Sequence, residues 1–375
     1  MKTIRLHCAV LCLFSFSVAA APKFTVAPFS ADVTVPIGHG MMGGYWKAKS
    51  VADPLYAKGV VLSGGDKPVV FVSVDWCEIR NASFDRWREV LAEAAGTSRE
   101  RVLVSAIHQH EAPVTDLEAQ RILERGGLKG SVCDLAFHEK AVQRAAAAVR
   151  ASLKNPKPVT HIGLGQAKVE KIASNRRYVL PDGKISFGRG SASGRNILAA
   201  NAPEGTIDPW IKTISFWNGD QPLAALSGYA THPMSYYRTG EVSADFPGIA
   251  RARRQKETPD CLQVYFSGAS GNVTAGKYNT GERKNRPVLA NRLHREGEGV
   301  PFFIREMFRG LLDEGVIVRG EGGKRGHITL SAAEISESIL PVPSSIREAI
   351  KERVAPLIQV AKVLVNVLAV ARAEL

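Results

Sequence analysis

A strand–helix–strand pattern in the first third of the chain limits the fold more than any other feature. Residues 68–75 (PVVFVSVD) are a Val-rich apolar run that follows Gly-Gly-Asp, as expected of a buried strand. Residues 84–95 carry apolar side chains at helical spacing, and residues 102–107 form a second apolar run. A strand, a helix and a strand in this order predict a βαβ unit and therefore an α/β domain.

The chain continues to alternate between predicted helices and strands, with long loops between them. An Ala-rich helix is predicted at residues 137–153. Further strands are predicted at residues 161–164, 211–217, 223–229 and 262–266. Long loops on an α/β scaffold, such as residues 181–209 here, commonly carry binding and catalytic residues.

The first twenty residues have the layout of a secretory signal peptide. Lys2 and Arg5 precede an apolar stretch at residues 6–18, and three alanines follow at 19–21. The apolar stretch is too short to cross a hydrocarbon core of roughly 30 Å. We therefore expect residues 1–20 to be a signal peptide and the protein to be secreted or periplasmic. The alternative is a short N-terminal anchor that stays uncut.

The pattern changes after residue 293. A helix is predicted at residues 302–312, a hairpin at 316–330, and a last helix that begins at the capping box of residues 345–348. We expect an α/β domain over residues 21–295 and a small, mostly helical, divergent segment over residues 296–375.

Composition and charge narrow the class of protein. With 45% hydrophobic and 23% charged residues, the chain is an ordinary globular protein and not a disordered or collagen-like one. After the leader, Cys77, Cys133 and Cys261 form no CxxC pair, which excludes a disulfide framework and predicts small buried side chains. The net charge of +13 would suit nucleic acid, but an exported protein rarely meets it. The charge is then a solvated basic surface, or a field that attracts an anionic or membrane-bound substrate.

Two histidine motifs stand at the ends of predicted strands. His108 and His110 follow the apolar run at residues 102–107, and His232 precedes a proline after another apolar run. If the first strand continues through His110, both of its imidazoles lie on one face. Imidazole is the commonest metal ligand, and ligands bind at the carboxyl ends of strands in α/β sheets. The three histidines predict a metal site; the alternative is a set of satisfied polar side chains where a loop begins.

A Gly-rich turn follows the last predicted strand. Residues 266–279 (FSGASGNVTAGKYN) combine glycines with hydroxyl and amide side chains. They contain neither the GxSxG of a nucleophile elbow nor the Gly-Lys-Ser/Thr of a P-loop. One interpretation is a tight structural turn. The other is a loop that stabilises an oxyanion, with Thr274 or Asn272 facing the metal.

Taken in order, these motifs resemble the N-terminal catalytic domain of the neutral/alkaline ceramidase family. The family's His-Thr-His-Ser-Gly-Pro and Gly-Asp-Val-Ser-Pro motifs are similar to HQHEAP and GNVTA in this sequence. Each motif is short, and the ordered set is far more specific than any one of them. The similar segments are residues 31–34, 41–45, 55–58, 108–113, 175–177, 231–235 and 271–275.

The resemblance implies a zinc-dependent hydrolase that cleaves the amide bond of N-acyl sphingoid lipids. Carried over to this sequence, it implies that His108 and His232 hold one zinc ion, with His110 beside them as a catalytic or substrate-contacting group. Arg176 would contact the amide or acid end of the substrate, and the turn at Gly271 would help to bind it.

Two departures from the family pattern affect the catalytic residues. Thr274 stands where the family has its serine nucleophile, and Asn272 where it has an aspartate. Threonine can attack a carbonyl, but its β-branched hydroxyl is more hindered, and the loss of the aspartate removes a negative charge beside it. Either Thr274 attacks, or water activated by zinc attacks and Thr274 donates a hydrogen bond.

The family's remaining zinc ligands, a Glu and a Tyr, have no match after residue 293 of this chain. Asp75, Asp245 and Tyr278 are candidates for a further ligand.

For the fold as a whole, we expect mixed β-sheets flanked by helices, in an α/β/β/α layering.

The leading functional hypothesis is an exported zinc hydrolase that acts on an N-acyl lipid or a related N-acyl compound, with peripheral contact to an anionic membrane. The alternative is a ceramidase-like binding protein that has lost catalysis, which the changes at Thr274 and Asn272 favour. A nucleic-acid binder is disfavoured, and the oligomeric state is left open.

Overall fold

A computed structural model describes residues 24–296, 317–318 and 327–328 of the chain. The predicted signal peptide and the predicted helices at residues 302–312 and after 345 lie outside these described residues. The predicted hairpin at residues 316–330 is partly described: β20 (Ile317–Val318) pairs antiparallel with β21 (His327–Ile328). The domain boundaries stay predictions.

The first sheet contains the predicted βαβ unit. Its β6 and β8 are parallel, and α1 (Asn81–Ala95) connects them, with α3 (Leu135–Ser152) packed beside α1. This arrangement confirms the expected unit. In hydrogen-bonding order the strands are β10 (Lys157–Pro158), β1 (Thr25–Asp32), β5 (Tyr56–Ser63), β6 (Val69–Val74) and β8 (Val102–Ala106).

The second sheet also contains two parallel strands that are connected through a helix. Its β16 and β18 are parallel and are connected through α5 (Asp245–Glu257), against which α6 (Asn285–Glu296) packs. All four of its strands were predicted, and β11 is longer than expected. In hydrogen-bonding order they are β11 (His161–Lys168), β15 (Trp210–Asn218), β16 (Gln221–Tyr229) and β18 (Leu262–Ser267).

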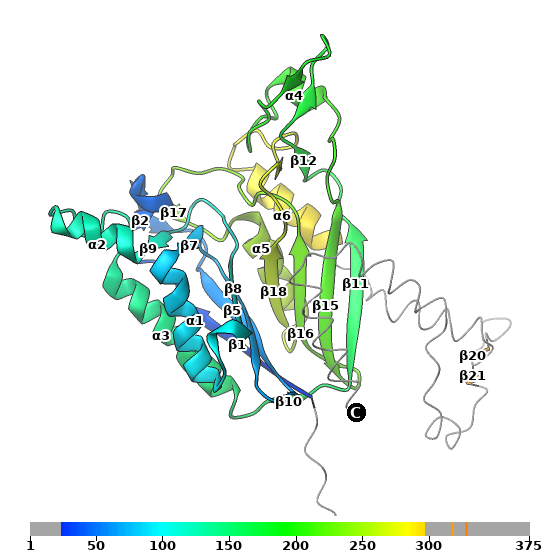
Figure 1. The fold of residues 1–375 in the computed structure, drawn as a ribbon. Coiled ribbons are helices and arrows are strands. Elements are labelled where there is room, and N and C mark those ends of the chain that lie inside the picture. The colour runs from blue at the N-terminus through cyan, green and yellow to red at the C-terminus, as the bar shows by residue number, and fades with distance from the viewer. Residues whose placement is uncertain (1–23, 297–316, 319–326, 329–375) are drawn as a thin grey trace, which may run out of the picture.

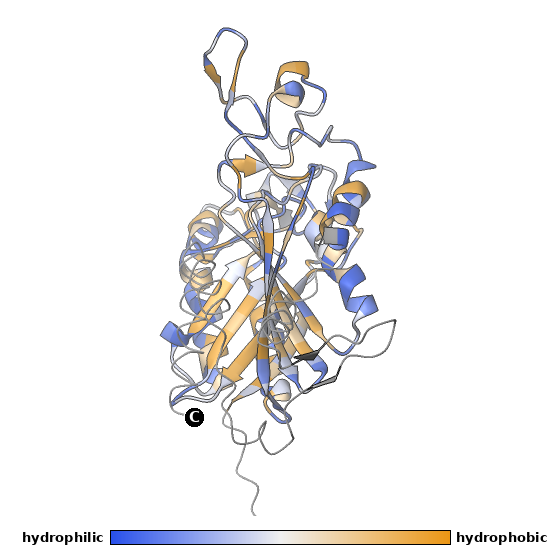
Figure 2. Ribbon diagram, turned by 90° about the vertical axis from the view of Figure 1, so that its right-hand side faces the viewer, coloured by the Kyte–Doolittle hydropathy of each residue, from blue (hydrophilic) through white to orange (hydrophobic). Residues whose placement is uncertain are grey.

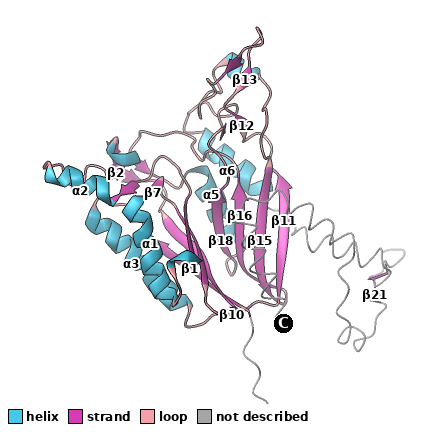
Figure 3. Cartoon of the chain, viewed as in Figure 1, coloured by secondary structure: helices cyan, strands magenta, loops and turns pink. Residues whose placement is uncertain are grey.

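The two sheets pack face to face between two helical layers (Figures 1 and 3). One apolar cluster between the sheets joins Val60 and Phe71 of the first to Phe216 and Val264 of the second. The Ser73 hydroxyl also donates across the interface to a backbone carbonyl of β18 at 2.6 Å. Other clusters fill the space under α1 and α3, and under α5 and α6. The described residues therefore confirm the expected α/β/β/α layering.

Hydropathy explains the layering. The strands between the helical layers are mostly apolar, whereas the helices carry polar residues on their outer sides (Figure 2). As the sequence predicted, β6 is an apolar run that is buried along its whole length, and α1 buries one apolar face. Cys77, Cys133 and Cys261 are free and buried, as expected. Within the described residues, no helix is long and apolar enough to cross a membrane.

Short elements gather where the parallel strands end, because each of these strands leads into one of them (Figure 1). The long loop predicted at residues 181–209 forms two of them, β14 and α4. The full set of short elements is β2 (Gly40–Met41), β3 (Trp46–Lys47), β4 (Ser50–Val51), β7 (Glu78–Arg80), β9 (Val114–Asp116), α2 (Leu117–Arg125), β12 (Ser174–Asn175), β13 (Tyr178–Val179), β14 (Ile185–Ser186), α4 (Ile197–Asn201), β17 (Glu241–Val242) and β19 (Val273–Thr274).

Candidate metal centre and active site

His108 and His110 come together through a turn and not through a strand. The strand β8 ends at Ala106, and His108 has a φ of +79°, in the left-handed region that side chains other than glycine rarely adopt. The expectation that β8 continues through His110 is therefore wrong. The two imidazole rings still converge, with centroids 5.5 Å apart. A strained backbone that orients such a side chain is common at functional sites.

His232 reaches the same place from the second sheet. It follows β16, and its backbone N–H donates to the Val273 carbonyl at 3.0 Å. Its ring centroid lies 4.9 Å from that of His108 and 4.8 Å from that of His110. The Nε2 atoms of His232 and His110 are 3.1 Å apart. The three predicted histidines thus form one cluster at the carboxyl ends of strands from both sheets.

The protonation of the cluster suits metal binding. His108 Nδ1 lies 3.0 Å from the Cys77 carbonyl, which can only accept a hydrogen bond, so Nδ1 carries the proton and Nε2 has the free lone pair. Burial is the main cause that lowers the pKa of His110 to about 4 and that of His232 to about 2. The nearby histidines and Arg176 lower both values further. Neutral imidazoles are the form that metals bind.

The nitrogens of His110 and His232 have the spacing of two ligands on one zinc ion. Two nitrogens that each lie about 2.0–2.1 Å from one zinc ion can be separated by the distance seen between His110 and His232. Among the described residues, His110 Nδ1 is buried without a hydrogen-bond partner, so the ring is not held by a structural role on that side. A set of imidazole nitrogens also matches zinc better than it matches calcium or magnesium.

Cys77 offers a second way to complete a metal site. Its Sγ and one nitrogen each of His108 and His110 lie within 4.8 Å of one another, so this group can also hold an ion. Burial raises the pKa of the Cys77 thiol, which disfavours the thiolate that a metal needs. Cys77 also lies on the Nδ1 side of His108, whose proton its own carbonyl accepts. The structure therefore offers two overlapping ligand sets, Cys77 with His108 and His110, and the three histidines.

Arg176 stands beside the histidines with an unsatisfied guanidinium. Its backbone N–H donates to the Asn272 carbonyl at 2.9 Å, which fixes it next to the Gly-rich turn. Its side chain is half-buried, and among the described residues its Nε has no hydrogen-bond partner. A desolvated cation at this position favours an anion or a carbonyl oxygen as its ligand.

The three predicted site residues of the Gly-rich turn, Gly271, Asn272 and Thr274, have different surroundings. Thr274 is fully buried, its backbone forms a bridge with that of His232, and its hydroxyl has no partner among the described residues. The Asn272 amide donates to Asn175 Oδ1 at 2.8 Å, so its side chain is engaged with β12. Gly271 is exposed, and a Cβ there would meet open space. Thr274 is therefore the predicted turn residue that the fold joins to the histidines.

Comparison with known proteins clarifies the architecture. No family model matches the chain, and no curated protein matches it. Among solved structures, the neutral ceramidase from Pseudomonas aeruginosa superimposes with a TM-score of 0.56 at 17% identity, over 74% of this chain and 44% of its own. A ceramidase complexed with C2 matches with a TM-score of 0.56 at 16% identity, over 74% of this chain and 43% of its own. The fold is ceramidase-like.

This identity is low enough that the match shows the fold alone. The chain spans less than half the length of the ceramidases that it matches. It is thus a divergent and shorter ceramidase-like fold, which confirms the resemblance at the level of architecture.

The three further ligand candidates have other partners in this ceramidase-like fold. Both oxygens of Asp75 accept from Arg251, at 2.6 and 2.5 Å. Asp245 accepts from the backbone of Ser235 and lies 3.4 Å from Arg286. The Tyr278 hydroxyl donates to Glu204 at 2.5 Å. Within the part of the chain that the structure describes, these three side chains are engaged elsewhere and belong to no metal-ligand group with the histidines.

Sequence reasoning missed a group of residues beside the histidine cluster. The Tyr237 ring lies edge-on to His110 at 5.4 Å and beside Trp46 at 5.9 Å. The buried Glu111 carboxylate accepts from Trp46 Nε1 and from the backbone and hydroxyl of Thr239. Glu111 thereby joins β3, which carries Trp46, to the loop of Thr239, which also carries Tyr237. Its position directly after the histidine motif was the one available signal.

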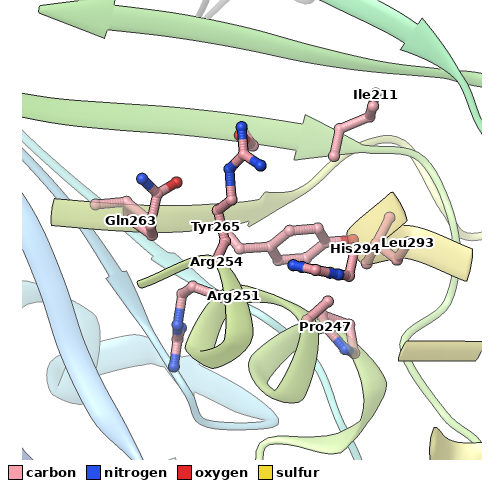
Figure 4. A pocket seen from close by; sticks show the side chains of 11 residues that line it. Ile211, Pro247, Arg251, Arg254, Gln263, Tyr265, Leu293 and His294 are labelled. Atoms are coloured by element: carbon pink, nitrogen blue, oxygen red, sulfur yellow. The ribbon is translucent and has the colours of Figure 1, made fainter. Parts of the chain in front are cut away.

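A separate cavity lies between the second sheet and the helices α5 and α6 (Figure 4). None of its lining residues was predicted as a site residue, and the histidine cluster does not line it. Arg251 points from it toward Asp75 and is already paired. We assign this cavity no function. Residues that line it include Ile211, Pro247, Arg254, Gln263, Tyr265 and Leu293.

Proposed function

We propose that this protein is a zinc-dependent hydrolase that cleaves the amide bond of an N-acyl lipid or a related N-acyl compound. The observation that carries the proposal is the cluster of His108, His110 and His232, which comes from both sheets and whose ring centroids lie within 5.5 Å of one another. The ceramidase-like fold and its lipid-hydrolysing relatives, as their names describe them, support the substrate class.

Each residue of the cluster has a proposed role. His108 and His232 would hold zinc, as the resemblance implied. His110, with a pKa lowered to about 4, is a weak base near neutral pH, so it suits a third ligand better than a proton acceptor. When bound, zinc would polarise the scissile carbonyl as a Lewis acid.

The remaining roles belong to side chains around the cluster. Arg176 would bind the carbonyl oxygen of the substrate and stabilise the negative charge that develops there. The Thr274 hydroxyl would donate a hydrogen bond to the carbonyl oxygen, or attack the carbonyl carbon. Attack would form an acyl ester as the C–N bond breaks, the amine would leave with the hydroxyl proton, and water would then hydrolyse the ester. Trp46 and Tyr237 would exclude water on the side of His110. Asn272 would position Asn175 and the Arg176 loop, and not take part in catalysis itself.

Export and membrane contact belong to the same proposal. The predicted leader at residues 1–20 would take the protein out of the cytoplasm. The basic excess of the chain, +13 overall, would draw it to anionic membrane surfaces where a lipid substrate is found.

Metal analysis tests the proposed centre directly. Purified full-length protein should contain one zinc ion per chain, and His232→Ala should lose it. His161→Ala is the matched control, since His161 stacks on Trp217 in the second sheet away from the cluster and should leave the zinc in place. Cys77→Ser should also keep it. A parent protein that binds no zinc after reconstitution contradicts the proposal.

The substrate is tested by direct comparison. N-acyl sphingosine, simple N-acyl amines and carboxylic esters should be assayed in parallel with the zinc-loaded protein. Hydrolysis of an N-acyl substrate supports amide cleavage, and preference for N-acyl sphingosine narrows the substrate to ceramides. Activity on esters alone rejects it.

One observation favours the second candidate, a binding protein that has lost catalysis. The Thr274 hydroxyl is fully buried, whereas a nucleophile must reach its substrate. Ligand binding without turnover in the parent, with affinity unchanged in Thr274→Ala, would favour this candidate over the hydrolase.

A further inference from the structure

The segment at residues 176–201, here called the apical module, has its apolar side chains on the outside. It contains β13, β14 and α4 and projects beyond the ends of the sheets (Figure 1). Apolar segments in both β13–β14 and α4 are visible at that end in Figure 2. Five of its large apolar side chains are between half and three-quarters exposed: Val179, Ile185, Phe187, Ile197 and Leu198. Single exposed apolar residues are ordinary, but five within about twenty residues form a patch.

The interior of the apical module is filled by a cation. Arg189 is fully buried, and its guanidinium donates to the backbone carbonyls of Ala199 and Ala202 at 2.7 to 3.1 Å. Lys277 reaches the same helix end and donates to two of its carbonyls. Polar groups therefore hold the module together from within. A module that carries large apolar side chains on its outside over a buried cation is suited to an apolar surface.

Cations surround the apolar patch. The module has five basic residues against one acidic residue, Asp182. Arg177 is exposed and lies over the Phe187 ring at 5.2 Å, so its charge is carried on the patch itself. Lys184 and Arg195 each have one carboxylate neighbour, and both basic side chains stay at least 70% exposed, where water weakens such pairs.

The module is joined to the histidine cluster through two short strands. It begins directly after β12, whose Ser174 is paired with Thr274 of β19, and Thr274 in turn bridges to His232. Arg176 is the first residue of the module and faces the cluster. A surface bound by the module would therefore lie next to the site.

We propose that the apical module docks the protein onto the surface of an anionic lipid bilayer. Apolar side chains at its edge would enter the interfacial region, and Arg177, Lys184 and Arg195 would contact anionic headgroups. A second copy of the chain is a poorer occupant, because a symmetric contact would bring these cations against their own counterparts. This inference rests on the proposed function, because docking at this place would bring a lipid substrate to the histidines. The experiments that test it are separate from those that test hydrolysis.

Vesicle sedimentation tests the surface with the full chain. The parent should bind vesicles of phosphatidylcholine mixed with phosphatidylglycerol, and bind vesicles of phosphatidylcholine alone much more weakly. The double variant Ile185→Ser, Phe187→Ser should bind about tenfold less, because two exposed apolar side chains that would enter the bilayer are lost. Ile122→Ser is the matched control, since Ile122 on α2 is 59% exposed and Ile185 is 60% exposed.

Charge is tested with a second pair of variants. Lys184→Glu should reduce binding to the anionic vesicles severalfold and weaken its salt dependence. Lys140→Glu changes the net charge equally on the exposed side of α3 and should have little effect. Equal losses in both variants would show a general charge effect and overturn the assignment to the module.

The outcomes separate this inference from the proposed function. If a detergent-dispersed N-acyl substrate is hydrolysed equally by the parent and the double variant, and neither binds vesicles, the docking surface is wrong and the hydrolase stands. Vesicle binding that the double variant loses, without hydrolysis of any N-acyl substrate, supports the surface and rejects the hydrolase. Concentration-dependent dimerisation that the double variant abolishes, without vesicle binding, overturns the lipid partner in favour of a second copy.

Discussion

At the scale of single residues, backbone conformation and burial decide which motif residues reach the site. His108 needs a left-handed turn to face His232, and Thr274 needs the β12–β19 pairing to lie beside it. Asn272 and Gly271 belong to the same motif, yet one side chain bonds to Asn175 and the other position is open to water. Neighbours in sequence therefore do not share a role.

Thr274 provides the residue-scale prediction. If its hydroxyl attacks or stabilises the carbonyl, Thr274→Ala should lower kcat/KM by about a hundredfold or more, which is the usual loss when one such group is removed. Thr274→Ser should keep or raise the activity, because the serine hydroxyl is less hindered. Steady-state kinetics on the best N-acyl substrate measures both.

Two controls make the Thr274 result specific. Thr213→Ala alters a hydroxyl of β15 that pairs with Ser227, away from the histidines, and should leave kcat/KM unchanged. Zinc content should be the same in all three variants. An active Thr274→Ala with full zinc would remove Thr274 from the mechanism.

At the scale of elements, polar contacts between helices create a pH dependence. His138 on α3 is buried, and its Nε2 lies 2.6 Å from Ser83 Oγ on α1. Burial is the main cause that lowers the pKa of His138 from 6.5 to about 4. The unfolded chain therefore binds more protons than the folded one between these values.

The sign of the His138 effect follows from that difference. Its contribution to stability is fully present above pH 6.5 and is lost as the pH falls toward 4. At about pH 5 the loss amounts to about 2 kcal/mol. Urea unfolding at pH 7.5 and pH 5 should show that His138→Gln loses less stability on acidification than the parent, by about this amount. Equal losses in both proteins would show that another group is responsible.

At the scale of the whole molecule, a buried ion pair joins the first sheet to the helical layer that covers the second sheet. Asp75 follows β6 of the first sheet, and Arg251 lies on α5, which covers the second sheet. Asp75 also accepts from the backbone N–H of Tyr56 at 2.8 Å. Both side chains are almost completely buried, so each depends on the other for compensation of its charge.

Breaking this pair should weaken the whole fold. Asp75→Asn or Arg251→Met should each lower the free energy of unfolding by about 3–5 kcal/mol, because one charge is left buried without its partner. The double variant should lose less than the sum of the two. Denaturant unfolding of the four proteins measures the coupling.

An exposed ion pair provides the comparison. Arg99 and Glu89 are each nearly half exposed at a distance of 3.2 Å, and Glu89→Gln should cost less than about 1 kcal/mol. A cost for Asp75→Asn as small as that for Glu89→Gln would show that the buried pair does not hold the sheets together.

The sequence by itself determined several of the elements and the chemical types at the site. The apolar run before Asp75, the helix at residues 84–95 and the strands of the second sheet were predicted because apolar periodicity is a local property of the chain. The three histidines and Thr274 were recognised because each lies in a short motif that follows a predicted strand and resembles a motif of the ceramidase family. The buried, unpaired cysteines followed from their number and spacing.

Only the tertiary structure decided which of these residues meet. His110 and His232 are 122 residues apart in sequence, and their contact depends on two sheets packing face to face. The pairing of Asp75 with Arg251, the framing of His110 by Tyr237 and Trp46, and the inverted apical module depend on the same packing. Local patterns report which side chains seek burial, but the partner that each one finds is set by the free energy of the complete packed molecule.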